Sequence, residues 1–361
     1  MKKYNLAIIP ADGIGPEVIG ASRKVLSVLA RVHGGVDFDF REFGWGSNHY
    51  LKSGEMMPKD GLQQLEHGGF DAILLGPVGS DKVPDHITLW GLLLTIRQGF
   101  EQYINLRPMR LLEGVSTPLR VEDRQSLDMV CVRENSEGEY SGVGGRVHSG
   151  KSQEVAIQTI VHTRSITEKT MRYAFEWAQK HGRKRVTSVT KSNSMQHNMV
   201  FWDDVFKKIS AEYPSIAKDE QLVDSMTVRM VNKPETVDVL VASNLFGDIL
   251  TDLGAALTGS LGLAPSANLN PERNYPSLFQ AIHGSAFDLV GKNVANPIAS
   301  VWSAQLMLDF IGETELAARL MHAIEAVLKE KKVRTRDLGG TNSTTELTDA
   351  LCQILQDKHA Q

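Results

Sequence analysis

Short apolar runs alternate with amphipathic segments along most of the chain. The runs at 6–9, 71–75, 186–190 and 237–242 have the length and β-branched character of buried strands. A polar or glycine-rich cluster follows each of them, and helical periodicity then resumes. Strands that alternate with helices in this way predict an α/β fold. Ligands of such folds usually bind at the carboxyl ends of the strands, so the polar clusters are the first places to look for a site.

Two of the predicted helices have recognisable start signals. One begins at Pro16 or Glu17, because proline is tolerated in the first turn of a helix. The other covers 165–182, where Ser165 and Glu168 have the spacing of a capping box and a glycine ends the helix.

Length and composition narrow the class of protein. A chain of 361 residues exceeds what one core usually covers, so two domains are expected. The net charge of −4 offers no basic excess for nucleic acid or a membrane surface, and no segment approaches the roughly 20 apolar residues of a membrane helix. Cys131 and Cys352 belong to no CxxC pair, which argues against zinc and disulfides. We therefore expect a cytoplasmic protein with neither a nucleic-acid nor a membrane partner.

Two aspartates follow the apolar run at 237–242. Asp248 and Asp252 lie in N-L-F-G-D-I-L-T-D and would share one face of a helix. Like charges at this spacing destabilise a helix slightly unless a hard cation such as Mg²⁺ or Mn²⁺ neutralises them. Acidic residues also favour the first turn of a helix. On spacing alone, the capping interpretation is favoured over the metal site.

Three arginines are candidates for binding a carboxylate. Arg107 stands before a proline and should lie in extended backbone, Arg133 follows an apolar run, and Arg97 shares a predicted helical face with Trp90 and Leu93. The planar guanidinium fits carboxylates, so three convergent arginines would bind a dicarboxylate. Three separate salt-bridged or surface arginines are the alternative.

Three further segments carry candidate chemistry. Tyr140 lies in a polar loop and is either a general acid or a capped loop tyrosine. Lys191 ends an apolar run, where a lysine with a lowered pKa could act as a base, although most lysines are simply exposed. The glycine-rich stretch 283–297 could hold a pyrophosphate on its backbone amides. No G-x-G-x-x-G is present, and a turn-rich loop without a ligand is the alternative.

Taken together, these motifs closely resemble the metal-dependent β-decarboxylating dehydrogenases, which include isopropylmalate, isocitrate, homoisocitrate and tartrate/D-malate dehydrogenases. The resemblance extends from 8 to 345, and its most specific part is N-L-F-G-D-I-L-T-D-L-G followed by G-S-L-G-L at 259–263. It implies an α/β subunit with the isopropylmalate dehydrogenase-like two-domain fold, unlike a standard Rossmann fold. The implied NAD-binding domain is 1–102 plus 263–361, and 103–262 forms the substrate, metal and dimerisation domain.

The resemblance also implies a role for each candidate residue. The substrate-binding residues would be Arg97, Arg107, Arg133, Trp90 and Leu93. Tyr140 would be the general acid and Lys191 the base. The metal ligands would be Asp224, Asp248 and Asp252. The NAD-binding residues would be Ile14, His283, Gly284, Ser285, Ala286, Asp288 and Asn296.

The same resemblance implies cofactors and a partner. We expect NAD, with Mn²⁺ or Mg²⁺ and K⁺ as the metal ions. Asp288 favours NAD because it would repel a 2′-phosphate. Lys191 and Asp224 would reach across from a second subunit, so a homodimer with shared active sites is expected. Ala11 and Phe287 depart from the family pattern, which has glycine and proline there, and would alter NAD affinity.

The segment before Arg97 bears on the substrate. Isocitrate dehydrogenases have serine and asparagine where this chain has Gly91 and Leu93, and a third carboxylate would be unpaired against leucine. The run 83–91 resembles the tartrate/D-malate members, and Trp90 should fill the space that an isopropyl group needs. We therefore expect decarboxylation of D-malate to pyruvate and CO2, oxidation of tartrate, or both, with 3-isopropylmalate second. A non-catalytic regulatory subunit is disfavoured because the implied catalytic groups are all present.

Overall fold

The chain forms two structural units, and the first contains both ends of the sequence. The computed structural model describes residues 1–120 and 127–357. Its first unit comprises Met1–Gln102, Leu111–Gln125 and Ala255–Gln361, and its second comprises Tyr103–Arg110 and Ser126–Gly254. The expected division placed 111–120 and 255–262 with the second domain. Hydrogen bonds within the first unit hold them there instead, for example from Arg334 to the carbonyl of Gly114 and from Thr117 to that of Leu257.

The first unit is built on a mainly parallel sheet with strand order β2-β1-β3-β12-β11. Only the β11–β12 pair is antiparallel. The strands are β1 Lys2–Ile9, β2 Val36–Glu42, β3 Ala72–Leu75, β11 Pro265–Leu269 and β12 Ser277–Ala281. Every residue of β3, β11 and β12 is buried, as expected for strands covered on both faces.

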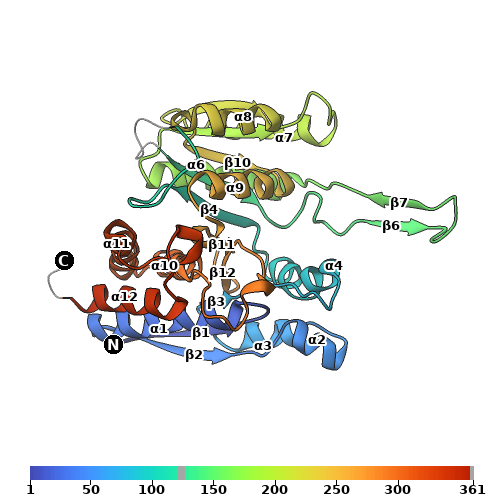
Figure 1. The fold of residues 1–361 in the computed structure, drawn as a ribbon. Helices are drawn as coiled ribbons and strands as arrows, with labels where there is room; N and C mark the ends of the chain where they lie inside the picture. Colours follow the sequence, from blue (N-terminus) through green and yellow to red (C-terminus); the bar gives the residue numbers. More distant parts are fainter. Residues whose placement is uncertain (121–126, 358–361) are drawn as a thin grey trace. The chain divides into compact units, whose positions relative to one another are not determined.

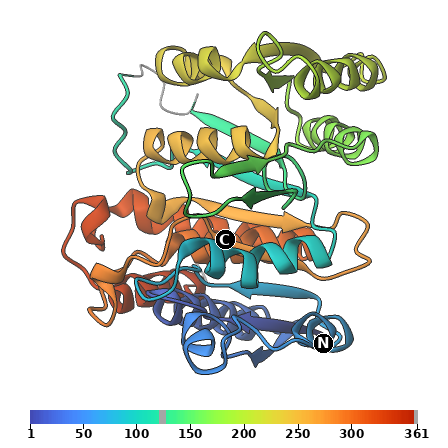
Figure 2. The same ribbon diagram turned by 90° about the vertical axis from the view of Figure 1, so that its right-hand side faces the viewer.

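Helices from both ends of the sequence cover this sheet. Blue and red segments lie side by side in Figures 1 and 2 because α1 packs against α10 and α12. The long helices are α1 Gly15–His33, α10 Ile298–Ile311, α11 Thr314–Glu330 and α12 Thr344–Gln356. The shorter ones are α2 Ser47–Ser53, α3 Gly61–His67, α4 Asp85–Thr88, η1 Leu89–Leu94, α5 Thr95–Gly99, η4 Leu261–Leu263, η5 Phe287–Leu289 and η6 Arg336–Leu338.

The large strands of the second unit lie in the order β4-β5-β10-β8-β9. All neighbouring strands are parallel except β4 and β5. The strands are β4 Ile104–Arg110, β5 Asp128–Glu134, β8 Arg185–Thr190, β9 Ala217–Leu222 and β10 Val239–Ala242. The helices are α6 Arg164–Lys180, α7 Asn198–Ser210, α8 Val223–Asn232, η3 Pro234–Thr236 and α9 Asn244–Leu257.

A two-stranded hairpin belongs to the second unit. It pairs β6 Gly144–Val147 with β7 Val155–Gln158 in antiparallel register, and Figure 1 shows it as a long arm extending from its unit. All of its strand residues are exposed, including Val147, Val155 and Ile157. Isolated hairpins are marginally stable in water, so these apolar side chains need an explanation beyond the single chain.

Most sequence-based elements agree with this architecture, but one helix start differs. The α/β fold and the four apolar strands are confirmed as β1, β3, β8 and β10, and α1 has Pro16 in its first turn. The predicted capping box of Ser165 and Glu168 is wrong. Thr163 is the N-cap of α6 and accepts from the amide of Ile166, because a threonine two residues earlier in extended backbone takes that role first. Within residues 1–120 and 127–357, no helix is long and apolar enough to cross a membrane.

A buried aspartate fixes the turn after β1. Asp12 accepts hydrogen bonds from the amide of Ser47 at 2.7 Å, from its hydroxyl at 2.8 Å, and from the amide of Gly79 at 2.9 Å. Its side chain therefore joins the turns that follow β1, β2 and β3.

Replacement of Asp12 should destabilise the first unit. Asp12→Ala leaves buried donors without partners, so the free energy of unfolding should fall by about 3 kcal/mol. Urea denaturation followed by circular dichroism measures this loss. Asp39→Ala, which removes an exposed carboxylate paired with Lys3, is the control and should change little. Equal stability of the two variants would contradict a structural role for Asp12.

Candidate active site

Helix α9 presents two carboxylates at the end of a buried strand. Every residue of β10 is buried, and α9 begins two residues after that strand, at Asn244. Asp248 and Asp252 are one turn apart on this helix, as the spacing predicted. Neither lies in the first turn, so they do not act as simple helix caps.

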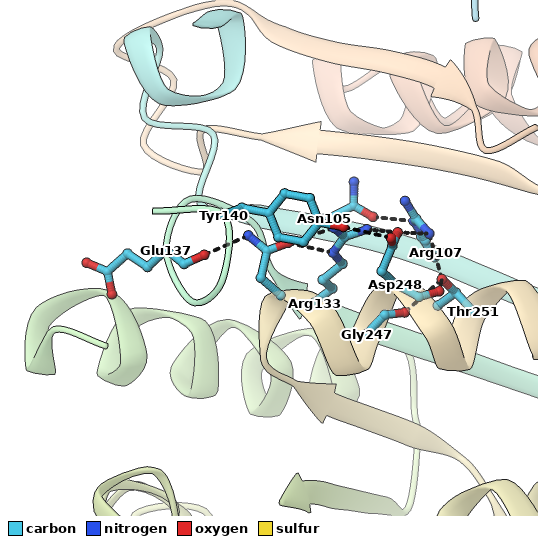
Figure 3. A network of polar contacts seen from close by, with 9 residues as sticks. Asn105, Arg107, Arg133, Glu137, Tyr140, Gly247, Asp248 and Thr251 are labelled. Carbon is cyan, nitrogen blue, oxygen red and sulfur yellow. Dashed lines mark hydrogen bonds and ion pairs between the residues drawn. The ribbon is translucent and has the colours of Figure 1, made fainter. Parts of the chain in front are cut away.

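Two buried arginines converge on the first of these carboxylates. Arg107 comes from β4 and Arg133 from β5, and both side chains are nearly inaccessible to solvent. Nη1 of Arg107 lies 3.3 Å from Oδ1 of Asp248, and Nη1 of Arg133 donates to the same oxygen (Figure 3). The structure therefore brings together two of the three arginines as an ion-paired cluster rather than as separate surface residues.

The arginines are held by buried neutral groups as well. Nε of Arg107 donates to Oδ1 of Asn105 at 2.6 Å, and its Nη1 donates to Oγ1 of Thr251, also at 2.6 Å. These bonds fix the orientation of the guanidinium, so it need not reorganise before it binds an anion.

Gly247 makes the close approach of Arg133 to α9 possible. A Cβ atom at position 247 would lie 2.7 Å from both Cβ and Cγ of Arg133. Any larger residue would push the arginine away from Asp248, which explains physically why glycine stands in N-L-F-G-D.

Tyr140 joins the same cluster. Its hydroxyl donates to Oδ2 of Asp248 at 3.1 Å, and the guanidinium carbon of Arg133 lies 5.5 Å from the centre of its ring (Figure 3). Tyr140 is thus placed beside charged groups that can bind or polarise a ligand, and it is more than a tyrosine that caps a loop.

Burial shapes the ionisation of the cluster. Desolvation, reinforced by the charge of Arg133, lowers the pKa of Arg107 to about 10, while Asp248 and Asp252 oppose the shift. Burial raises the pKa of Asp252, with Arg107 opposing and Asp248 reinforcing that shift. A divalent cation beside Asp248 and Asp252 would reverse this effect by favouring their charged forms, so the two carboxylates fit a metal site.

Lys191 and Asp224 form a separate ion pair. Lys191 follows β8, Asp224 lies in the first turn of α8, and Nζ to Oδ1 is 2.7 Å. The hydrogen bond from Lys191 lowers the pKa of Asp224. In the part of one chain that the structure describes, no three His, Cys, Asp or Glu side chains are gathered as a metal site. Asp224 is therefore not clustered with Asp248 and Asp252 within one chain.

The helix predicted around Trp90 has a different geometry. Residues 89–94 form a π-helix and α5 continues to Gly99, so α-helical spacing does not apply. Trp90 is 37% exposed whereas Leu93 is 7% exposed. The prediction that both residues share one helical face with Arg97 is therefore wrong. The wider turn is accompanied by a hydrogen bond from the hydroxyl of Thr95 to the carbonyl of Trp90. Such π-turns are frequent at functional sites. Arg97 itself is buried in the first unit.

A pocket of about 650 Å³ lies in the first unit. The predicted cofactor residues that line it are Ile14, His283, Gly284, Ala286, Asp288 and Asn296. Ser285 does not line it but joins its walls: its hydroxyl donates to the carbonyl of Gly79 and its carbonyl accepts from the amide of Ile14, both at 3.0 Å. Desolvation lowers the pKa of His283.

Sequence reasoning missed part of this pocket. Asp337 accepts from Asn296 Nδ2 at 2.9 Å and from the hydroxyl of Ser260 at 2.7 Å, and Arg336 and Gly262 also line the wall. The available signals were the polar cluster before Gly339-Gly340 and the G-S-L-G-L motif. Neither has a spacing that points to a nucleotide, so only the fold places them beside 283–296.

Comparison with known proteins places this arrangement in a family. The family model described as isocitrate/isopropylmalate dehydrogenase matches residues 5–351. A probable tartrate dehydrogenase/decarboxylase of Agrobacterium vitis is 52% identical over 98% of each chain. The D-malate dehydrogenase [decarboxylating] of Escherichia coli (strain K12) is 48% identical over 98% of this chain and 99% of its own. The crystal structure of isocitrate dehydrogenase from Methylococcus capsulatus is 33% identical, has a TM-score of 0.87 and is covered over its full length.

The chain belongs to the isocitrate/isopropylmalate dehydrogenase family. Its relatives at about half identity include proteins named tartrate dehydrogenase/decarboxylase and D-malate dehydrogenase (decarboxylating). The family resemblance and the fold class predicted from the sequence are thereby confirmed.

One further carboxyl lies at the end of β5, just before residues 135–140, which we call the Tyr140 loop. Glu134 is fully buried, and its Oε1 accepts from the amide and hydroxyl of Ser136 and from the amide of Glu137 at 2.7–2.9 Å. Burial raises its pKa from 4.5 to about 7, although these hydrogen bonds oppose the shift.

Glu134 should make stability depend on pH. The folded state holds this proton more tightly than the unfolded state, so the contribution is present below pH 4.5 and is lost as pH rises to about 7. The loss is of the order of 3 kcal/mol. Thermal unfolding between pH 5 and pH 8 measures it, and Glu134→Gln should flatten that part of the curve whereas the exposed Glu235→Gln should not. An unchanged slope in Glu134→Gln would exclude the assignment.

Proposed function

We propose that the chain is an NAD-dependent, divalent-metal-dependent dehydrogenase of 2-hydroxy dicarboxylic acids. It would convert D-malate to pyruvate and CO2 and oxidise tartrate. The observation that carries this proposal is the cluster of Arg107, Arg133, Tyr140 and Asp248. It stands in a chain about half identical, over nearly its whole length, to proteins named for these two substrates.

The acidic pair on α9 is the proposed metal site. Asp248 and Asp252 would hold Mg²⁺ or Mn²⁺ together with Asp224 of a second copy, and K⁺ is a further expected cation. When bound, the divalent ion would acidify the substrate hydroxyl and stabilise negative charge on the adjoining oxygen.

The chain's own residues then have distinct tasks. Arg107 and Arg133, with Arg97, bind the carboxylates and orient C2. Lys191 takes the proton of the C2 hydroxyl, and Tyr140 gives its phenolic proton to C3 after the second carboxylate has left as CO2.

Trp90 and Leu93 would contact the end of the substrate that differs between family members. NAD, as the hydride acceptor, would occupy the pocket of the first unit, where Asp288 disfavours a 2′-phosphate.

A second copy of this chain is the proposed partner. Lys191 and Asp224 form a pair outside the α9 cluster, so each site would be completed by the pair of the other subunit. The exposed hairpin β6–β7, with Val147, Val155 and Ile157, offers strand edges and apolar surface for such an assembly. The two buried free cysteines fit a reducing compartment, and we propose the cytoplasm.

The proposed activity can be tested with a panel of acids. Purified protein with Mn²⁺, K⁺ and NAD should form NADH from D-malate or from a tartrate isomer, and EDTA should abolish turnover because the hydroxyl is no longer acidified. 3-Isopropylmalate and isocitrate are the comparison substrates. Turnover of 3-isopropylmalate alone would contradict the assignment around Trp90, and no NADH from any acid would favour a regulatory subunit.

Shared sites can be tested by complementation. Asp252→Asn and Lys191→Ala should each be inactive while remaining folded dimers. A mixed dimer retains one intact site, because the unaltered Asp252 of one subunit meets the unaltered Lys191 of the other. Random pairing on co-expression makes about half of the dimers mixed, so about a quarter of wild-type activity should return. Size-exclusion chromatography controls for assembly, and a mixture of Asp252→Asn with wild type corrects for dilution. No recovery in an assembled mixture would show that each subunit completes its own site.

A further inference from the structure

One buried amide connects two parts of the proposed site. Asn244, the first residue of α9, has no solvent exposure. Its Oδ1 accepts from Nε and Nη2 of Arg133 at 3.0 and 2.6 Å, and its Nδ2 donates to the carbonyl of Glu137 at 3.0 Å.

The two bonds of Oδ1 determine how Arg133 can be used. They occupy one edge of the guanidinium and leave Nη1 for Asp248. A planar fork held along one edge has a fixed plane, so its remaining donors point in one direction. Arg133 can therefore bind an anion at the α9 cluster while it keeps its two hydrogen bonds to Asn244.

The bond of Nδ2 acts on a different element. The carbonyl of Glu137 belongs to the loop that leaves β5 and leads to Tyr140. The hydroxyl of Tyr140 reaches Oδ2 of Asp248, while Arg133 reaches Oδ1 of the same carboxylate. A shift of the loop would thus move the phenol relative to the arginine, and Asn244 is bonded both to the loop and to the arginine.

We propose that Asn244 is a positioning residue that sets Arg133 and the Tyr140 loop in one geometry. This inference rests on the proposed function and deepens it: one side chain aligns the group that binds a carboxylate with the group that protonates C3. In that protonation the O–H bond of Tyr140 breaks, a C3–H bond forms, and solvent later returns a proton to the phenolate. Asn244 itself exchanges no proton.

Asn244→Asp separates the two tasks of the amide. The variant keeps an oxygen acceptor for Arg133 but replaces the Nδ2 donor by an oxygen facing the carbonyl of Glu137. The loop loses its bond, while an acidic residue at the start of α9 is favourable for the helix. A defect in this variant therefore does not arise from loss of α9.

Asn105→Asp is the matched control. Asn105 is equally buried, lies opposite Arg133 in the β4–β5 register, and accepts from Nε of Arg107. Its bond to Arg107 supports an arginine of the same cluster, and it does so from strand β4 rather than from the start of α9. General effects of a new buried carboxylate should appear in both variants, whereas a loop effect should appear only in Asn244→Asp.

The test compares the two half-reactions of the full-length enzyme with Mg²⁺. Hydride transfer is followed as single-turnover NADH formation from D-malate. Proton transfer at C3 is followed as exchange of the methyl hydrogens of pyruvate with D2O by NMR. Asn244→Asp should slow exchange about ten-fold or more relative to hydride transfer, and Asn105→Asp should leave that ratio unchanged. An unchanged ratio in Asn244→Asp, or the same change in both variants, would overturn the proposal.

A second readout needs no turnover. In protein containing 13C-labelled tyrosine, the Tyr140 signals, assigned with Tyr140→Phe, should shift or broaden in Asn244→Asp and not in Asn105→Asp. Identical Tyr140 signals in wild type and Asn244→Asp would overturn the positioning role. If wild type neither oxidises the acids nor exchanges pyruvate, the proposed function fails, and these signals alone decide the role of Asn244.

Discussion

The site of the second unit depends on one buried electrostatic arrangement, in which two arginines share the carboxylate of Asp248. Arg107 and Arg133 are almost completely removed from water, and a buried cation without a partner would be costly. Asp248 supplies the compensating charge, while Asn105, Thr251 and Asn244 accept hydrogen bonds from the two guanidinium groups. The cluster is therefore preorganised: its charges are held in place by the fold before any ligand arrives.

This arrangement also explains the local sequence of α9. Gly247 lets Arg133 lie against the helix, and Thr251 stands one turn after it to receive Arg107. Asp252 is drawn into the field of the same arginines, but burial and the neighbouring Asp248 still raise its pKa. Two neighbouring carboxylates of this kind are suited to binding a cation. The cation would neutralise the negative charge that the arginines alone now compensate.

The pocket of the first unit is built from different interactions than the cluster on α9. Its walls include loops that follow β1 and β12, and hydrogen bonds such as those of Ser285 and Asp337 join the wall segments. Ile14, Leu289 and Val294 supply apolar surface, and backbone amides and a few polar side chains can fix the orientation of a bound ligand. A mostly apolar wall with few polar groups fits a flat heterocyclic cofactor, whereas the charged cluster of the second unit fits a small dianion.

The sequence by itself determined the α/β class, the buried strands and the one-turn spacing of Asp248 and Asp252, because each depends on local periodicity. Its motifs also indicated the family, since N-L-F-G-D-I-L-T-D is specific as a string of residues. Local patterns could not show that Arg107 and Arg133 share one carboxylate, because strand pairing brings residues far apart in the chain together. They also gave the wrong geometry for 89–97, where one wider turn changes which side chains face inward. Only the tertiary structure decided the partners of Tyr140 and the bonds of Asn244, because these join a loop, two strands and a helix through contacts that have no period in the sequence.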